Sequence, residues 1–180
     1  MAHFYGMSAA GTHGRERATN MLDGGAPFYN VYRCADDKWI ALGAIEPQFH
    51  ALLLEKTGLA DLASSPQMAR EGWPALTARI AAVIAGKSQA EWCAILEGTD
   101  ACFAPVLDMT EAPAHHHNRA RNSFVEIAGV VQPAPAPRFS STPTAVQGPP
   151  PEIGEHNSAA LGDWGLSEAR IEGLRRDGVI

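Results

Sequence analysis

The sequence predicts an α+β fold: a small domain with a short antiparallel sheet and helices, then a proline-rich strap, then a detached helical tail. Two β-rich runs, 28–33 and 39–45, flank a polar loop, as in a hairpin. Three segments with helix start signals follow. Seven of the thirteen prolines lie between residues 133 and 151. The expected division is a lead-in at 1–27, a small domain at 28–132, a connector at 133–153 and a helical segment at 154–180.

The first 27 residues are rich in Gly, Ala, Ser and Thr and end in "NMLDGGAPF". Asp23-Gly24-Gly25 predicts a tight turn, and the segment as a whole is interpreted as a lead-in rather than a packed unit. The same glycines could direct backbone N–H groups at a ligand, although this motif alone is weak. The run 39–45 is almost continuously apolar, which indicates a strand buried on both faces or a strand end that enters a site.

Local signals define the three helices. The segment 47–58 starts with proline and ends with glycine, and 73–87 repeats that arrangement with a proline at its second position. In "SQAEWCAIL", Ser88 and Glu91 form a capping box. The expected inward residues are Phe49, Leu52, Leu53 and Lys56 in the first helix and Leu76, Ile80, Val83 and Ile84 in the second.

Shorter elements are expected beyond residue 100. The segment 101–107 predicts a strand, 108–118 a short helix or turn, and 123–131 another strand. The proline-rich stretch must be extended and poor in backbone hydrogen bonds. The tail predicts one or two helices, the second starting at Ser167 as its N-cap.

Composition excludes several classes of function. A formal charge of −6, with fourteen Lys and Arg residues scattered singly, argues against a nucleic-acid surface. No apolar run approaches the ~18 residues of a membrane span, and the N-terminus lacks a signal-type apolar segment. Cys34, Cys93 and Cys102 form no C-x-x-C pair, so we interpret them as buried small hydrophobes in a reducing compartment. The expected location is the cytoplasm, with no nucleic acid or membrane as partner.

Glu46 is the main candidate site residue. In "LGAIEPQF" it stands between a strand-like run and the proline that opens a helix. A carboxylate there is stabilised by the helix dipole, so it could be helix punctuation. Its apolar neighbours favour function instead, because buried ionisable groups concentrate at sites. Both interpretations stay open from the residues alone.

Other polar motifs favour structural roles. Successive residues of a helix point about 100° apart, so His115 to His117 cannot converge on one metal, and no metal site is expected. Gly154 to Asn157, "GEHN", could cap the following helix or receive a phosphate at its N-terminus. No phosphate-binding, dinucleotide or serine-hydrolase motif occurs.

Three stretches carry a family resemblance: "NMLDGGAPFYNVYRCADDKWIALGAIEPQFHALL", "KSQAEWCAILEGTDACFAPVL" and "IGEHN". They resemble the C-terminal half of the α-methylacyl-CoA racemases, in the family III CoA-transferase superfamily, from about Asn20 to the C-terminus. The resemblance implies that the tail docks on a Rossmann-like large domain built mainly by an N-terminal half. It also implies interlocked subunits that bind acyl-CoA between the large domain of one and the small domain of the other.

The resemblance also implies a chemistry. One base removes the proton α to the thioester carbonyl, and an acid on the opposite face returns a proton to the enolate. A histidine paired with a glutamate serves one face, and an aspartate serves the other. Glu46 stands at the place of that glutamate, so it would orient the histidine and stabilise its charged form. The resemblance implies a role in lipid and fatty acid metabolism. It implies no separate cofactor, because coenzyme A is part of the thioester substrate.

The implied histidine and aspartate belong to the N-terminal half. His3, His13 and residues 115–117 do not stand in their motif, and the chain is expected to begin inside the linker before the small domain. It would act as a homodimer or with a chain that supplies the other half. Two alternatives stay open: a fragment of a family III CoA-transferase, which uses an aspartate nucleophile from the same half, and a catalytically silent dimerisation or interaction module.

Overall fold

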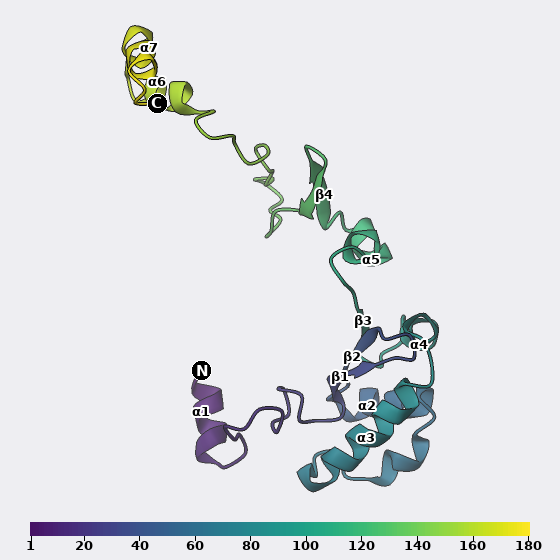
Figure 1. Cartoon of the computed structure of the whole chain (residues 1–180). Helices are drawn as coiled ribbons and strands as arrows, with labels where there is room; N and C mark the ends of the chain where they lie inside the picture. Colours follow the sequence, from purple (N-terminus) through teal and green to yellow (C-terminus); the bar gives the residue numbers. More distant parts are fainter. The chain divides into compact units, whose positions relative to one another are not determined.

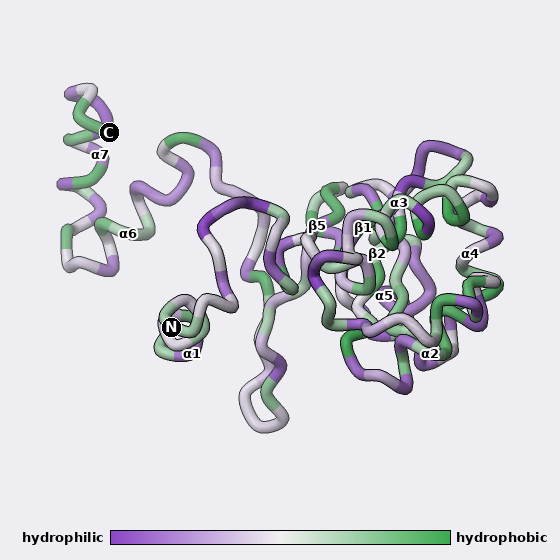
Figure 2. The backbone as a smooth tube through the Cα atoms, turned by 90° about the horizontal axis from the view of Figure 1, so that it is seen from below, coloured by the Kyte–Doolittle hydropathy of each residue, from purple (hydrophilic) through white to green (hydrophobic).

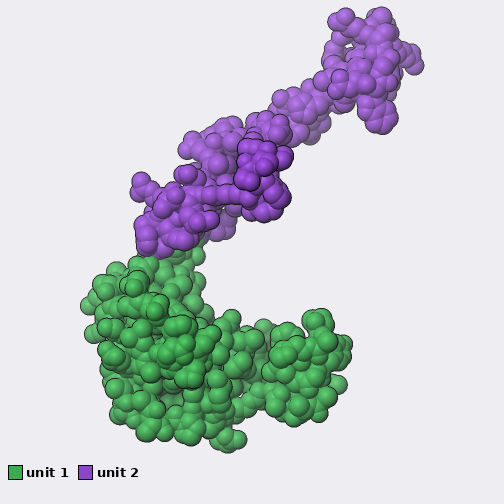
Figure 3. Space-filling view, turned by 180° about the vertical axis from the view of Figure 1, so that it is seen from behind, with its two compact units in different colours: residues 1–108 green, residues 109–180 purple.

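A computed structural model describes all 180 residues, and the chain forms two compact units, residues 1–108 and 109–180 (Figure 3). Each unit is described by itself. The division expected from composition, with boundaries after residues 27, 132 and 153, stays a prediction.

The first unit is built on a three-stranded antiparallel sheet of order β1-β2-β3, where β1 is Tyr29–Arg33, β2 is Trp39–Gly43 and β3 is Phe103–Val106. The predicted hairpin is confirmed, with Val31 opposite Ala41, which in turn faces Ala104. On each edge strand, one backbone N–H is unavailable to another chain. On β1 the side-chain oxygen of Asn30 accepts the N–H of Val31 at 2.8 Å. On β3, Pro105 has no N–H to offer.

The three expected helices are present and pack on one face of this sheet: α2 (Pro47–Lys56), α3 (Trp73–Ile84) and α4 (Gln89–Leu96) (Figure 1). The capping box is confirmed, since the Ser88 side chain accepts the Glu91 N–H and Glu91 Oε2 accepts the Ser88 N–H at 2.8 Å. Helix α1 (Ala2–Ala9) and the 3₁₀ turns η1 (Ala60–Ser64) and η2 (Arg70–Gly72) were not expected from the sequence.

The main core lies between the sheet and these helices. One expected inward position is wrong: Lys56 is exposed, and Leu54 is buried beside Leu53. Burial of a lysine ammonium carries a large desolvation cost, so the helix turns its adjacent leucines to the core. The largest fully buried side chains of this core are Ile40, Leu53, Leu54, Ile84, Trp92 and Leu96.

The end of the predicted lead-in packs against the start of α3. Ala26 and Phe28 are fully buried and form a second cluster with Trp73, against which Met21 and Ile45 pack. Helix α1, by contrast, has no buried residue. The predicted turn at Asp23-Gly24-Gly25 is present. Local composition did not indicate that the residues after it pack against Trp73 at the start of α3.

The second unit begins with η3 (Ala112–Ala114) and α5 (His116–Ala120), followed by β4 (Phe124–Ile127) and β5 (Val130–Pro133). The stretch 123–131 is therefore a hairpin rather than the single strand expected. Its two-residue turn, Ala128-Gly129, has φ of 48° and 79°, the left-handed geometry that tight hairpins require. Alanine at the first position gave no turn signal.

The proline-rich stretch contains no helix or strand between residues 134 and 156, as expected. Helix α6 (Asn157–Asp163) and helix α7 (Glu168–Arg176) then pair, and Arg175 donates to the Ser158 hydroxyl at 2.6 Å. The predicted N-cap Ser167 accepts the Arg170 N–H. Hydrophobic and hydrophilic residues alternate along α7 (Figure 2), yet only Ile171 is buried there. None of the helices combines the length and apolar character that crossing a bilayer requires.

Replacing Leu53 by alanine should destabilise the first unit by about 2–5 kcal/mol, because it removes a side chain that is 1% exposed and leaves a cavity. The matched control, Leu22→Ala, acts at a leucine that is 48% exposed and should change stability by about 0.5 kcal/mol or less. Urea unfolding followed by far-ultraviolet circular dichroism measures both. Equal losses of stability would contradict the assigned core.

Candidate functional site

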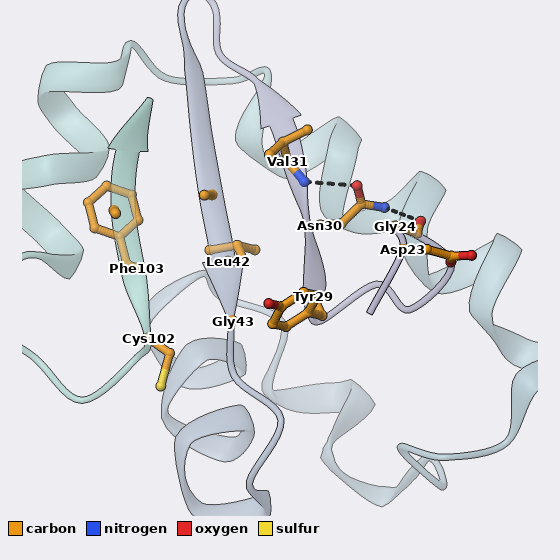
Figure 4. Close-up of a pocket in the computed structure, with 11 residues that line it drawn as sticks. Asp23, Gly24, Tyr29, Asn30, Val31, Leu42, Gly43, Cys102 and Phe103 are labelled. Carbon is orange, nitrogen blue, oxygen red and sulfur yellow. Dashed lines mark hydrogen bonds between the residues drawn. The ribbon is translucent and has the colours of Figure 1, made fainter. Parts of the chain in front are cut away.

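The first unit has a groove of about 540 Å³ on its sheet, and Figure 4 shows the side chains that line it. Its floor is the line of Val31, Ala41 and Ala104 across the three strands. These residues alternate with Tyr32, Ile40 and Leu42, which are buried in the core. Because side chains of a strand alternate between faces, the groove belongs to the face opposite the helices. Its lining is mostly apolar, with Tyr29 at one end.

Glu46 is the N-cap residue of α2, with extended backbone (φ −70°, ψ 140°). Its side chain is exposed and makes no capping hydrogen bond, so the structure does not use its carboxylate as helix punctuation. Partial burial, followed by the negative charges of Glu46 and Asp100, raises the pKa of the Cys102 thiol. Cys102 lines the groove, as does Gly43, which precedes Glu46 by three residues in the chain.

Backbone bonds fix the joint that leads to Glu46. The N–H of Gly43, at the end of β2, donates to the Cys102 carbonyl at 2.8 Å, and the Ile45 N–H donates to the Gly43 carbonyl at 2.9 Å. Pro47 occupies the first turn of α2, where its missing N–H costs nothing. The "GAIEPQF" motif is therefore a strand-to-helix joint, as its sequence indicated.

The Asp-Gly-Gly turn forms another wall of the groove. Asp23 accepts the Asn20 backbone N–H and side-chain amide, both at 2.7 Å, and these bonds lower the pKa of its carboxyl. Asn30 donates to the Gly24 carbonyl at 2.7 Å, as drawn in Figure 4. The Gly25 N–H donates to the Asn20 carbonyl, so the turn uses this group internally rather than for a ligand. A β-carbon at Gly25 would lie 2.6 Å from that carbonyl oxygen.

No histidine of the first unit pairs with the Glu46 carboxylate. The His50 N–H donates to the Glu46 carbonyl at 2.9 Å, but its imidazole packs edge-on against Phe28, with ring centroids 5.6 Å apart. Burial lowers the pKa of His50. The His13 ring packs against Phe4. Glu46 therefore stands without an imidazole partner within residues 1–108.

The remaining sequence candidates lie in the second unit. His115 is the N-cap residue of α5, and His116 and His117 are exposed in its first turn. In "GEHN", Gly154 forms the turn at φ 80°, but no side chain caps α6, so the capping expectation is wrong. The Glu155 carboxylate instead accepts a hydrogen bond from the Glu152 backbone N–H at 2.8 Å.

The cysteines are less uniform than expected. Cys34 is buried, and burial raises its pKa to about 11. Cys93 is half-buried. Cys102 is exposed, which corrects the expectation that all three are buried hydrophobes, because it sits at the end of the sheet where no helix covers it.

Comparison with known proteins gives consistent matches. Residues 1–157 match the model of CoA-transferase family III. The chain is 45% identical to the α-methylacyl-CoA racemases of Mus musculus and Homo sapiens over 166 residues, which is 91% of this chain and 44% of each racemase. The chain thus spans less than half the length of these relatives. A CAIB/BAIF family protein from Brucella suis has a similar fold, with a TM-score of 0.66 at 17% identity, over 88% of this chain and 43% of that protein.

Replacing Glu46 by glutamine should lower the pKa of Cys102, because it removes a negative charge that disfavours the thiolate. A larger thiolate fraction makes alkylation of Cys102 faster at a fixed pH between about 8 and 9. Mass-spectrometric rates with iodoacetamide measure the change, and Glu55→Gln, an exposed glutamate later in α2, is the control. Equal rates in both variants would place Glu46 away from the groove.

Proposed function

This chain belongs to CoA-transferase family III, and we propose that it forms the C-terminal portion of an α-methylacyl-CoA racemase-like enzyme. The reaction is epimerisation of 2-methylacyl-CoA thioesters by 1,1-proton transfer through an enolate. The observation that carries the proposal is Glu46, a carboxylate held at a strand-to-helix joint near an apolar groove and left unused by the helix that it precedes.

In the proposed reaction one base removes the α-proton and an acid on the opposite face donates a proton to the enolate. Each of these groups must be positioned and must carry the right charge. Glu46 would accept a hydrogen bond from an imidazole, hold its orientation and favour its protonated form. Glu46 is thus a positioning residue. The histidine and the aspartate of the opposite face come from a chain that supplies the N-terminal half.

The groove would provide apolar surface for the acyl chain. Tyr29, Val31 and Ala104 contribute to it, and such surface suits a branched hydrocarbon better than a polar substrate. We propose no separate cofactor and no metal, since coenzyme A enters as part of the thioester, whose carbonyl activates the α-proton of the acyl group.

The partner proposed for this chain is a Rossmann-like large domain, in a homodimer or in a complex with a chain that contains it. The α6–α7 pair would dock on that domain. Trp164, 87% exposed at the end of α6, supports a docking role for the tail, because a large aromatic surface is usually covered. Leu166 and Leu174 are half-buried.

A family III CoA-transferase is the nearest rival proposal. Its chemistry needs an aspartate nucleophile that this chain would also have to receive from another. Transfer of CoA requires no glutamate beside the first turn of α2, so Glu46 favours the racemase. The similarity to racemases over 91% of the chain supports the same choice.

Co-expression of this chain with a matching N-terminal half should give a complex that exchanges the substrate α-proton with deuterated water. Replacing Glu46 by glutamine should slow this exchange at least about tenfold and preserve assembly, since acid–base groups contribute roughly 10²–10⁴-fold and their positioning is part of that factor. Deuterium incorporation is followed by mass spectrometry, and assembly by size-exclusion chromatography.

Three outcomes decide between the proposals. Exchange by this chain alone would refute the need for a second chain. A folded complex without exchange would favour a silent interaction module, and CoA transfer between acids in that complex would favour the transferase. The control variant is Glu55→Gln, which should exchange at the wild-type rate.

A further inference from the structure

We propose that Gln67 is a positioning residue that sets where the Glu46 carboxylate lies. This inference rests on the proposed function and extends it to a residue outside the "GAIEPQF" motif. Gln67 lies between η1 and η2, 21 residues after Glu46 in the sequence, and its side chain reaches the joint between β2 and α2.

The contact is a double one. The Gln67 side-chain amide donates to the carbonyls of Ala44 at 3.2 Å and of Ile45 at 2.8 Å. These two residues connect the end of β2 with Glu46 and belong to no helix or strand. Their carbonyls would otherwise lack the partners that a sheet supplies, and Ala44 is fully buried, so an unpaired carbonyl there would cost free energy.

Gln67 is itself anchored in the core. Its backbone carbonyl accepts the indole N–H of Trp73 at 2.9 Å. Trp73 is 4% exposed and packs edge-on against fully buried Phe28, with ring centroids 5.9 Å apart. Gln67 is therefore held at its backbone carbonyl by Trp73 of the aromatic cluster and at its side-chain amide by two successive carbonyls. A side chain fixed at both ends can define the path of the backbone that it touches.

The position of Glu46 follows from that path. Pro47 fixes the backbone on the C-terminal side of Glu46, and Gln67 fixes it on the N-terminal side. If the amide is lost, Ala44 and Ile45 gain freedom and the carboxylate no longer holds one place. In the proposed mechanism Glu46 contacts a histidine and not the thioester, so the loss should reduce kcat and leave KM nearly unchanged.

The test uses Gln67→Met, which keeps the length of the side chain and removes both donors. Gln147→Met, an exposed glutamine of the proline-rich stretch, is the matched control. The first readout needs no activity: hydrogen exchange in the full chain at the His50 amide, which bonds the Glu46 carbonyl at 2.9 Å. We expect exchange there to be at least about tenfold faster in Gln67→Met, with no change at the Trp92 amide of α4.

The second readout is a double-mutant cycle in the reconstituted complex. Gln67→Met should lower kcat for α-proton exchange at least about threefold in the wild-type background and have no further effect beside Glu46→Gln. An equal loss in both backgrounds would mean that Gln67 acts independently of Glu46 and would overturn the inference. Unchanged exchange at the His50 amide would overturn it as well.

The two proposals can fail separately. A wild-type complex without α-proton exchange would refute the racemase proposal, and the His50 amide would then still decide whether Gln67 holds the joint. Wild-type activity combined with unaltered kcat in Gln67→Met would refute the role of Gln67 and leave the racemase proposal standing.

Discussion

Helices α2, α3 and α4 all pack against one face of a three-stranded sheet, and the rest of the first unit follows from this arrangement. Buried side chains of the strands must alternate with side chains on the other face. One face therefore becomes the core, and the other keeps an apolar groove. The joint from β2 to α2 passes from the sheet to the helical layer, which brings Glu46 to the edge between the two. A charged group can stay hydrated there while it borders an apolar surface.

Glu46 and the residues that hold its joint differ in how well the sequence predicts them. Glu46, the capping box at Ser88 and the hairpin around 34–38 were predictable, because each depends on neighbours within a few residues. Gln67 and Asn20 were not. Both are polar residues in loops whose sequence carries no recognisable motif. Their side chains bond backbone carbonyls that come close only when the chain folds. The Ala128-Gly129 hairpin turn was missed because alanine rarely adopts positive φ.

Under the proposed function, the first unit supplies the carboxylate of a carboxylate–imidazole pair. A carboxylate at the end of a joint, with no imidazole beside it in residues 1–108, fits a chain that spans 44% of the length of the racemases it resembles. The joint is nevertheless held by several independent contacts: the Gly43–Cys102 bond, the Gln67 amide and the packing of Ile45 against the Phe28 cluster. These contacts fix one short backbone segment, which is consistent with a Glu46 position that is set before any partner chain binds.

The modified edges of the sheet bear on how the first unit can recognise other chains. On β1, Asn30 occupies the outward N–H of Val31, and on β3, Pro105 offers none. Neither edge is therefore a good template for strand addition, a route by which sheets aggregate or exchange segments. Recognition would then depend on side chains that meet the open face, where shape and chemistry discriminate. A sheet protected in this way can leave an apolar surface accessible with less risk of nonspecific self-association.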